Sequence, residues 1–284
     1  MPWVYLDGEL VAAERAALPA LDRGLLYGYG LFETMRSYGG RVFRLAQHYR
    51  RLRIGADLLA MRLPLTPEAL EEAADATLAR NAVADARLRL TVTAGPDGGR
   101  ASVLLIAREV TEYPPELRRR GMAAVVSAVR RNETSPLAGV KSLNCLDNLL
   151  AREEARRRGA GEAIFLNSRG FIAEGAASNV FLVRDGKLLA PGIGSGALPG
   201  ITREAVLELA GEEGLAVGEA DVSPGDLAAA AAEAFLTGSV MEVMPLVSVD
   251  GKPVGTGRPG PLTQRLAGAY RALVARETST ASAV

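Results

Sequence analysis

Lys141 is the residue whose type and position most suggest a chemical role. It lies in GVKSLNCLDNLLAREEARRRG (139–159), after a predicted strand and at the head of a predicted amphipathic helix. A cation there opposes the helix dipole, and a lysine at such a junction can be partly desolvated, which makes its amine nucleophilic. Taken alone, an exposed surface lysine is the commoner explanation for this position.

A carboxylate and a helix start offer groups that a lysine-centred site would use. Glu174 lies in FIAEGAASNVF, where a turn between two apolar strands would direct the carboxylate inward. Gly200, Ile201 and Thr202 begin a predicted helix, where free backbone N–H groups and a hydroxyl favour an anion. Each also has an ordinary explanation: a polar residue at a strand end for Glu174, and an N-cap for Thr202.

Two side chains elsewhere complete the set of anion-binding groups. Ser239 in FLTGSVMEV offers another hydroxyl, and Arg51 offers a guanidinium that can bind a phosphate through two hydrogen bonds. One lysine, one carboxylate and scattered anion-binding groups together indicate a bound cofactor rather than unaided side-chain chemistry.

Three other kinds of site are disfavoured because the sequence lacks the residues that they require. The only histidine, His48, lies in HYRRL, away from any paired carboxylate, and the only cysteine is Cys145, so a metal site is disfavoured. No G-x-S-x-G nucleophile motif occurs. The GYG tripeptide at 28–30 is followed at the sixth place by Glu33 rather than glycine, so we predict a tight hairpin there and not a dinucleotide site.

The composition indicates an ordinary globular chain. Its 284 residues include 33 basic and 33 acidic side chains, and this balance argues against a nucleic-acid partner. No apolar run is long enough to span a bilayer, and Asp7 and Glu9 interrupt the segment where a secretory signal would lie. A single cysteine suits a reducing compartment. We therefore expect a cytoplasmic protein without a membrane partner.

Hydrophobic periodicity predicts an α+β fold of two domains. Residues 1–112 have the patterns of hairpins around Asp-Gly and Gly-Gly turns, then two helices and two strands, which make a small N-terminal domain. The charged segment 113–121, with its Pro-Pro step, is predicted as the inter-domain connection. Residues 122–284 form the larger C-terminal domain, a meander of hairpins with helices, and carry Lys141.

Five ordered segments resemble those of the fold type IV pyridoxal-phosphate enzymes. They are LDRGLLYGYGLFETMRSYGGRVFRLAQHYRRL, VKSLNCLDNLLAREEA, EAIFLNSRGFIAEGAASNVFLV, ALPGITREAV and FLTGSVMEVMPL, and the match covers nearly the whole chain. The family includes branched-chain and D-amino acid aminotransferases, R-selective amine transaminases and aminodeoxychorismate lyases. The resemblance implies a small α/β domain, a larger β-barrel-like domain with helices, and pyridoxal 5′-phosphate as cofactor.

The resemblance also implies a role for each residue singled out above. Lys141 would form the Schiff base with the cofactor aldehyde and then move a proton between the substrate α-carbon and the cofactor C4′. Glu174 would pair with the pyridine nitrogen and favour its protonated form. The phosphate would be held by Arg51, Ile201, Thr202 and Ser239, with Leu198 packed on the ring.

Transamination between an amino acid or amine and a 2-oxo acid is the reaction of most branches of this family, and we predict it here. An aminodeoxychorismate lyase, which releases pyruvate and 4-aminobenzoate, is the alternative, because FETMR, ARLRLTVTAG and the GPDGGR turn are similar to those of the lyases. A cofactor-free binding protein on the same fold is a third hypothesis. Cys145 stands where branched-chain enzymes typically place a tyrosine, and Ala94 where D-amino acid enzymes typically place an arginine, so both substrate classes are disfavoured.

Substrate contacts and partners follow from the same resemblance. Arg89 and Arg100 are candidates for binding a substrate carboxylate, although both also suit solvated strand ends. Phe32, Val240 and Met241 are further candidates for substrate contacts. The expected partners are a small-molecule amino donor, a 2-oxo acid acceptor and a second copy of the chain, because the family implies a homodimer with its active site near the subunit interface.

Overall fold

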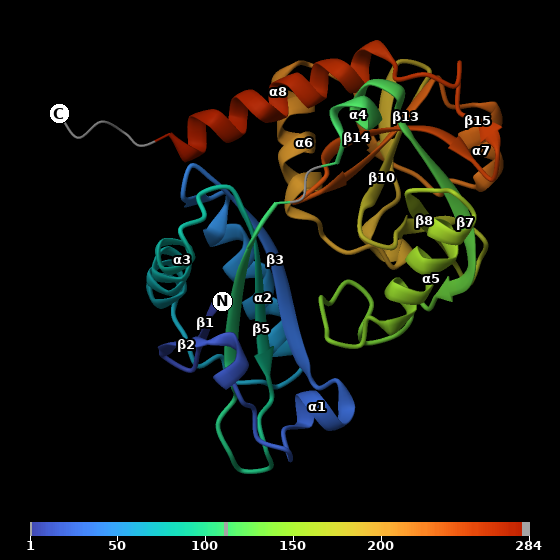
Figure 1. Ribbon diagram of the computed structural model, residues 1–284. Helices are drawn as coiled ribbons and strands as arrows, with labels where there is room; N and C mark the ends of the chain where they lie inside the picture. Colours follow the sequence, from blue (N-terminus) through green and yellow to red (C-terminus); the bar gives the residue numbers. More distant parts are fainter. Residues whose placement is uncertain (1, 111–112, 280–284) are drawn as a thin grey trace. The chain divides into compact units, whose positions relative to one another are not determined.

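The computed structural model describes residues 2–110 and 113–279 (Figure 1). Contacts between Cα atoms divide the chain into two compact units. Unit 1 comprises Met1–Thr111, Val140–Asn144 and Leu273–Val284, and unit 2 comprises Glu112–Gly139 and Cys145–Ala272. Lys141 therefore lies in unit 1, whereas the boundaries expected from the sequence assign it to the C-terminal domain.

Unit 1 is built on a six-stranded antiparallel sheet in the order β2-β1-β6-β5-β3-β4. The hairpin turns fall at Asp7-Gly8 and Gly39-Gly40, as the sequence predicts. Both residues of each turn adopt positive φ, which this type of turn requires. The strands are β1 (Trp3–Leu6), β2 (Glu9–Ala12), β3 (Gly30–Tyr38), β4 (Arg41–Val42), β5 (Ala86–Thr93) and β6 (Val103–Glu109).

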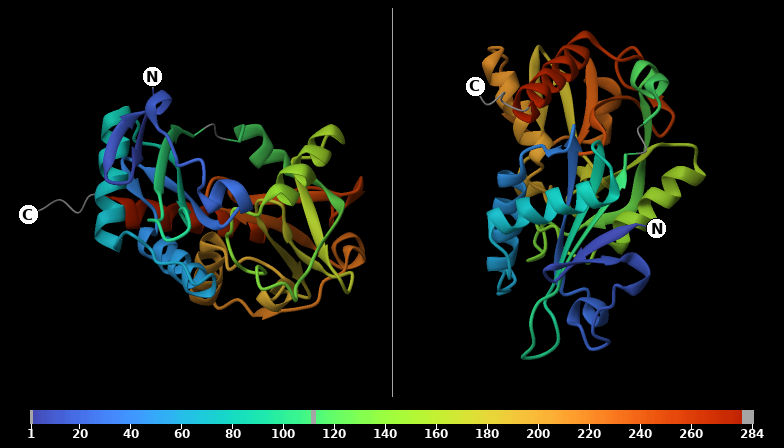
Figure 2. Two further views of the ribbon diagram at one scale, coloured as in Figure 1. Left: turned by 90° about the horizontal axis from the view of Figure 1, so that it is seen from below. Right: turned by 60° about the vertical axis from the view of Figure 1, so that its left-hand side comes forward.

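Two helices, α2 (Leu45–Leu58) and α3 (Pro67–Asn81), cover one face of this sheet (Figure 2). Alternation along β5 places Leu88, Leu90 and Val92 in the core beneath the helices, each with 0% exposure. The same alternation directs Arg89 to the opposite face of the sheet. The two helices leave that face uncovered, and Phe32 of β3 lies on it too.

A short helix, α1 (Arg23–Tyr27), occupies the segment where the sequence predicts the start of a hairpin. Asp22 caps it by accepting a hydrogen bond from the Gly24 N–H, and Gly28 ends it in the left-handed conformation, with φ 65°. The prediction of a tight hairpin at the GYG tripeptide is therefore wrong, because Gly28 serves as a helix cap and Gly30 begins β3.

Unit 2 contains a nine-stranded sheet in which β12-β11-β10-β13-β14-β7-β8-β9 are neighbours in that order and β15 pairs with β14. The pairs β7–β8, β7–β14 and β11–β12 are parallel. The strands are β7 (Met122–Arg131), β8 (Glu162–Asn167), β9 (Ile172–Gly175), β10 (Asn179–Arg184), β11 (Lys187–Ala190), β12 (Val217–Glu219), β13 (Glu233–Gly238), β14 (Glu242–Val249) and β15 (Lys252–Pro253).

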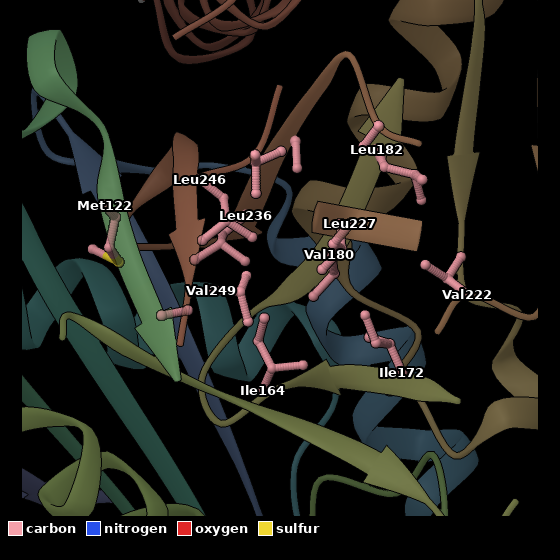
Figure 3. Close-up of a cluster of buried hydrophobic side chains, with 14 of the residues drawn as sticks. Met122, Ile164, Ile172, Val180, Leu182, Val222, Leu227, Leu236, Leu246 and Val249 are labelled. Atoms are coloured by element: carbon pink, nitrogen blue, oxygen red, sulfur yellow. The ribbon is translucent and has the colours of Figure 1, made fainter. Parts of the chain in front are cut away.

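This sheet curls into a half-barrel around a hydrophobic core (Figure 3). Ile164, Val180, Leu236 and Leu246 come from four different strands, point toward one another and are at most 2% exposed. The predicted α+β class with a barrel-like larger domain is confirmed. The helices of the unit are α4 (Pro115–Arg120), α5 (Leu146–Arg157), α6 (Ile201–Glu212), α7 (Pro224–Ala229) and α8 (Pro261–Thr278), the last of which extends into unit 1 from Leu273.

The segment 113–121 contains helix α4 and belongs to unit 2. Pro115 supplies the fixed φ that suits a first helical position, and three arginines in the last turn suit the helix dipole. Short helices of this kind carry too little periodicity to be separated from a charged connection in the sequence. Across the described ranges, the helices lack the length and apolar character that a membrane crossing requires.

Candidate active site

Lys141 is placed by backbone pairing with the start of β3. The Phe32 N–H donates to the Lys141 carbonyl and the Leu143 N–H donates to the Gly30 carbonyl, both at 2.9 Å. Leu31 and Ser142 form an antiparallel bridge between these two bonds. Helix α5 begins only at Leu146, so the expectation that Lys141 stands at the head of this helix, against its dipole, is wrong.

The Lys141 amine lies over the ring of Phe32, with Nζ 4.5 Å from the ring centroid. The Arg89 guanidinium contacts the same ring at 3.5 Å. Arg89 reaches Phe32 because β3 and β5 are paired with Thr34 opposite Arg89, which puts the residues on one face. The structure thus brings together three residues that the sequence analysis names separately: Lys141, Phe32 and Arg89.

Arg51 forms a buried cluster with Glu33 and His48 in unit 1. Arg51 Nε lies 2.8 Å from Glu33 Oε1, and Nη2 lies 2.5 Å from Oε2, so the guanidinium is held by two hydrogen bonds. His48 Nδ1 lies 2.8 Å from Glu33 Oε2. Helix α2 returns over β3 and sets His48 beside the single carboxylate of Glu33, a contact that the sequence did not indicate.

The ionisable groups of this cluster are almost fully buried. Burial alone would raise the pKa of the Glu33 carboxyl, but Arg51 and His48 lower it to about 2. Burial lowers the pKa of His48 below its usual value of 6.5, against the opposing effect of Glu33, and the charges of Arg51 and Lys141 lower it further. At neutral pH the cluster is an ion pair between Glu33 and Arg51 with a neutral imidazole.

Arg100 lies elsewhere in unit 1, in the turn after β5. It lines a surface cavity of about 790 Å³ together with Tyr29, Met61 and Arg62. The structure thus separates the two arginines proposed for a substrate carboxylate, because Arg89 contacts the ring next to the lysine amine and Arg100 lines this cavity.

Glu174 lies within strand β9 of unit 2 and is 7% exposed. One carboxylate oxygen accepts a hydrogen bond from Arg131 Nη2 and the other accepts one from the Leu198 N–H, both at 2.9 Å. The sequence analysis expected a turn at Glu174 and did not identify Arg131, whose position at the end of an apolar strand was the available signal. The two donors fix the orientation of a buried anion.

The N-terminus of α6 is held by Asn179 of β10. Asn179 Nδ2 donates to the Leu198 carbonyl at 2.9 Å, and a Cβ added at Gly200 would meet Asn179 Oδ1 at 2.0 Å. Gly200 therefore has to be glycine for the chain to approach this closely. It is the N-cap and provides no side-chain cap, so the first N–H groups of the helix, at Ile201 and Thr202, are left for an anion.

Thr237 of β13 stands opposite Asn179 in the sheet register, so both side chains lie on one face. The Thr237 hydroxyl is buried and, among the described residues, has no hydrogen-bond partner. Such a polar atom, next to the residue that holds the α6 start, suits a site that binds a polar ligand. The sequence analysis did not identify Thr237.

Ser239, Val240 and Met241 form a three-residue loop between β13 and β14, since Gly238 pairs with Glu242. Ser239 and Val240 are half-buried, whereas the Met241 side chain lies in the core of unit 2 and is 3% exposed. Met241 therefore presents its backbone, and not its side chain, to any ligand at this loop.

Comparison with known proteins decides the family. The family model described as amino-transferase class IV matches residues 30–249. This chain belongs to the class IV aminotransferases. The branched-chain-amino-acid aminotransferase of Salmonella typhimurium is 36% identical over 97% of this chain and 94% of its own length. The aminotransferase is thus a fold type IV pyridoxal-phosphate enzyme, as the sequence resemblance predicts.

Solved structures support the same assignment. The branched-chain amino acid aminotransferase of Escherichia coli superposes with a TM-score of 0.91 at 34% identity and covers 99% of this chain and 97% of its own. The T.th. branched-chain amino acid aminotransferase with pyridoxamine 5′-phosphate gives 0.90 at 32% identity, covering 97% and 95%. The same T.th. enzyme is also solved with N-(5′-phosphopyridoxyl)-L-glutamate and with 4-methylvaleric acid.

The comparisons confirm transamination as the activity of this aminotransferase and do not support the lyase alternative or a cofactor-free binding protein. They also correct the argument drawn from Cys145, because relatives that are more than a third identical carry the branched-chain name. A single residue near the lysine thus does not separate this chain from that branch.

The residues present fit pyridoxal 5′-phosphate, the cofactor of class IV aminotransferases. Glu174 offers an oriented carboxylate to a protonated ring nitrogen. The N–H groups at the start of α6 and the buried Thr237 hydroxyl offer donors to a phosphate. In unit 1, the Lys141 amine can form a Schiff base with an aldehyde, and the Arg51 guanidinium can bind a phosphate.

The single histidine makes the electrostatics of the Glu33 cluster measurable. Because the folded-state pKa of His48 lies below 6.5, the unfolded chain binds more protons than the folded one between these values. The free energy of unfolding should therefore fall as the pH drops below 6.5, and His48→Gln should flatten this dependence. In a proton NMR titration, the one imidazole signal should have its midpoint below 6.5; a midpoint at or above 6.5 would contradict this arrangement.

Proposed function

We propose that this aminotransferase exchanges the amino group of a branched-chain aliphatic amino acid with a 2-oxo acid, and that Lys141 is its catalytic residue. The observation that carries the proposal is the placement of the Lys141 amine over Phe32, beside Arg89, by backbone pairing with β3. The names of the relatives and solved structures support the substrate class.

When bound, pyridoxal phosphate supplies a carbonyl that reacts with amines and a ring that withdraws electrons from the substrate α-carbon. Lys141 would hold the cofactor through its amine. Once a substrate amine had displaced it, the same amine would move a proton between the substrate α-carbon and the cofactor C4′. Because the Lys141 backbone is fixed at its carbonyl, the side chain moves while its anchor stays in place.

The other residues hold and polarise the cofactor. Glu174 stabilises the proton on the ring nitrogen, since Arg131 and the Leu198 N–H hold its carboxylate in one orientation. Leu198 is itself held on both sides, by Glu174 and Asn179, and packs on the ring. The phosphate is bound by Arg51, Ile201, Thr202 and Ser239.

Substrate selection uses an apolar and a cationic group together. Phe32 and Val240 contact the aliphatic side chain of a branched-chain donor. Arg89, rather than Arg100, binds the second carboxylate of a dicarboxylic partner such as glutamate, because its guanidinium shares the Phe32 ring with Lys141. The T.th. structures, solved with 4-methylvaleric acid and with a phosphopyridoxyl-glutamate, support a pocket that takes both kinds of substrate.

Covalent labelling tests the role of Lys141 directly, because the sequence contains three lysines: Lys141, Lys187 and Lys252. Borohydride reduction of the loaded enzyme should fix one cofactor per chain, and peptide mass spectrometry should find it on Lys141. Lys141→Ala should lose the label and about 10³-fold in turnover, whereas Lys187→Ala should retain both. Glu174→Gln should keep the label and slow turnover. A label on Lys187 or Lys252 would rule out the assignment.

Arg89→Met should separate the two substrate types. Losing a charge-assisted hydrogen bond should raise the KM for glutamate and 2-oxoglutarate about tenfold, while the KM for leucine should change less than about twofold. Arg87→Met is the matched control, because Arg87 is exposed on the same strand and face. Steady-state kinetics with each substrate measure the split, and an equal rise for leucine and glutamate would show that Arg89 does not recognise the second carboxylate.

A homodimer remains part of the proposal, and an apolar helix face supports it. Leu146, Leu149 and Leu150 lie on one side of α5 and are 65%, 59% and 55% exposed, while Ala151 and Ala155 are buried against the sheet. Leu149→Lys should shift the dimer toward monomer in sedimentation velocity runs. Val217→Lys, at another exposed apolar position, should leave the dimer intact. An unchanged dimer in Leu149→Lys would exclude this face.

A further inference from the structure

The residue that directly follows the β13–β14 loop has a strained backbone. Three-residue hairpin loops usually place a glycine in the left-handed conformation that closes the turn. Here the residue is Glu242, at φ 59°, directly after the loop Ser239–Met241. A side chain is disfavoured in this conformation, so the surrounding structure has to hold the turn in place.

Arg118 of α4 contacts both sides of the strained position. Its Nη1 donates to the Met241 carbonyl at 3.1 Å and lies 3.3 Å from Glu242 Oε2. The Arg118 side chain is 21% exposed and that of Glu242 is 8% exposed, so the pair is shielded from water and salt. One guanidinium therefore fixes the backbone of the last loop residue and the side chain of the strained one.

Helix α4 is a firm support for this guanidinium. Leu117 packs on the hydrophobic core of unit 2. A Cβ added at Gly121, which ends the helix, would lie 2.2 Å from Val247 Cγ1, so the chain leaves α4 pressed against β14. The neighbouring side chains of Arg119 and Arg120 are 69% and 79% exposed and pair with Glu116 of their own helix.

The loop is also fixed to the segment that follows Glu174. A Cβ added at Gly238 would lie 3.1 Å from the Ala177 carbonyl, so β13 approaches this segment closely just before Ser239. The Met241 side chain is buried in the core. These two attachments and the Arg118 clamp hold the backbone on both sides of Ser239 and Val240.

We propose that Arg118 is a positioning residue of this aminotransferase, which holds the strained β13–β14 loop so that Ser239 meets the cofactor phosphate and Val240 meets the substrate. This inference rests on the proposed function. It assigns to Arg118 a role in cofactor affinity and in KM, which its neighbours Arg119 and Arg120 do not share.

The test compares Arg118→Met, which keeps the aliphatic stem, with Arg119→Met. Three quantities are measured for each: the Kd of the apoprotein for pyridoxal phosphate by fluorescence titration, KM and kcat with leucine, and the melting temperature. Arg118→Met should raise the Kd and KM about five- to tenfold and change kcat less than about threefold. Arg119→Met should match the wild type in all three.

A second substitution separates clamping from mere stabilisation. In Arg118→Met/Glu242→Gly, glycine adopts the left-handed conformation without strain, and the carboxylate that Arg118 contacts is removed together with Arg118. The Kd for pyridoxal phosphate should return to within about twofold of the wild type. If Arg118→Met raises the Kd and the double variant does not restore it, Arg118 acts other than through the loop and the proposal is overturned.

Two further outcomes are decisive. A lower melting temperature with unchanged Kd and KM in Arg118→Met would make Arg118 purely structural and overturn the proposal. If Arg118→Met does not fold, Arg118→Lys replaces it: lysine keeps the charge but has no planar fork, so a smaller rise in Kd is expected, and no rise overturns the proposal. Failure of the wild type to carry the cofactor on Lys141 would instead refute the proposed function, independently of every Arg118 variant.

Discussion

The pairing of residues 141–143 with the first residues of β3 is the interaction on which the chemistry of this protein depends. A lysine side chain has many rotamers, so its amine is useful in catalysis only when the backbone beneath it is fixed. Two backbone hydrogen bonds provide that anchor: the Phe32 N–H donates to the Lys141 carbonyl, and the Leu143 N–H donates to the Gly30 carbonyl. The same strand carries Phe32 on one face and Glu33 on the other, so β3 places both the lysine amine and the cluster that holds Arg51.

In unit 2, the candidate functional groups are likewise fixed in position, at the ends of the strands of the half-barrel. There the chain offers loops and a helix start with free backbone groups, while the barrel interior is filled by aliphatic side chains. Two buried carboxylates at these ends are paired with arginines, Glu174 with Arg131 and Glu242 with Arg118. Each pair orients a group or a loop, and this, more than any gain in stability, explains why charge is kept in such positions.

The helices and hairpins that the sequence predicts correctly are those whose segments show apolar periodicity or a specific turn sequence. The helices α2, α3 and α6 follow from apolar periodicity, and Thr66 caps α3 in the structure. The hairpins follow from Asp-Gly and Gly-Gly turns. Helices α1 and α4 contain five and six residues, too few for periodicity to show, and the sequence analysis missed both.

Residue types and spacings within short segments were enough to predict the fold class, the turns at Asp7-Gly8 and Gly39-Gly40 and the residues to consider at the site, while the family was predicted from the resemblance of five ordered segments. Which charges meet depends on the tertiary structure. His48 and Glu33 are 15 positions apart, and Arg131 and Glu174 are 43 positions apart. Such pairs are set by strand register and by the path of helices across a sheet, which depend on the packing of the whole core and leave no pattern in either segment alone.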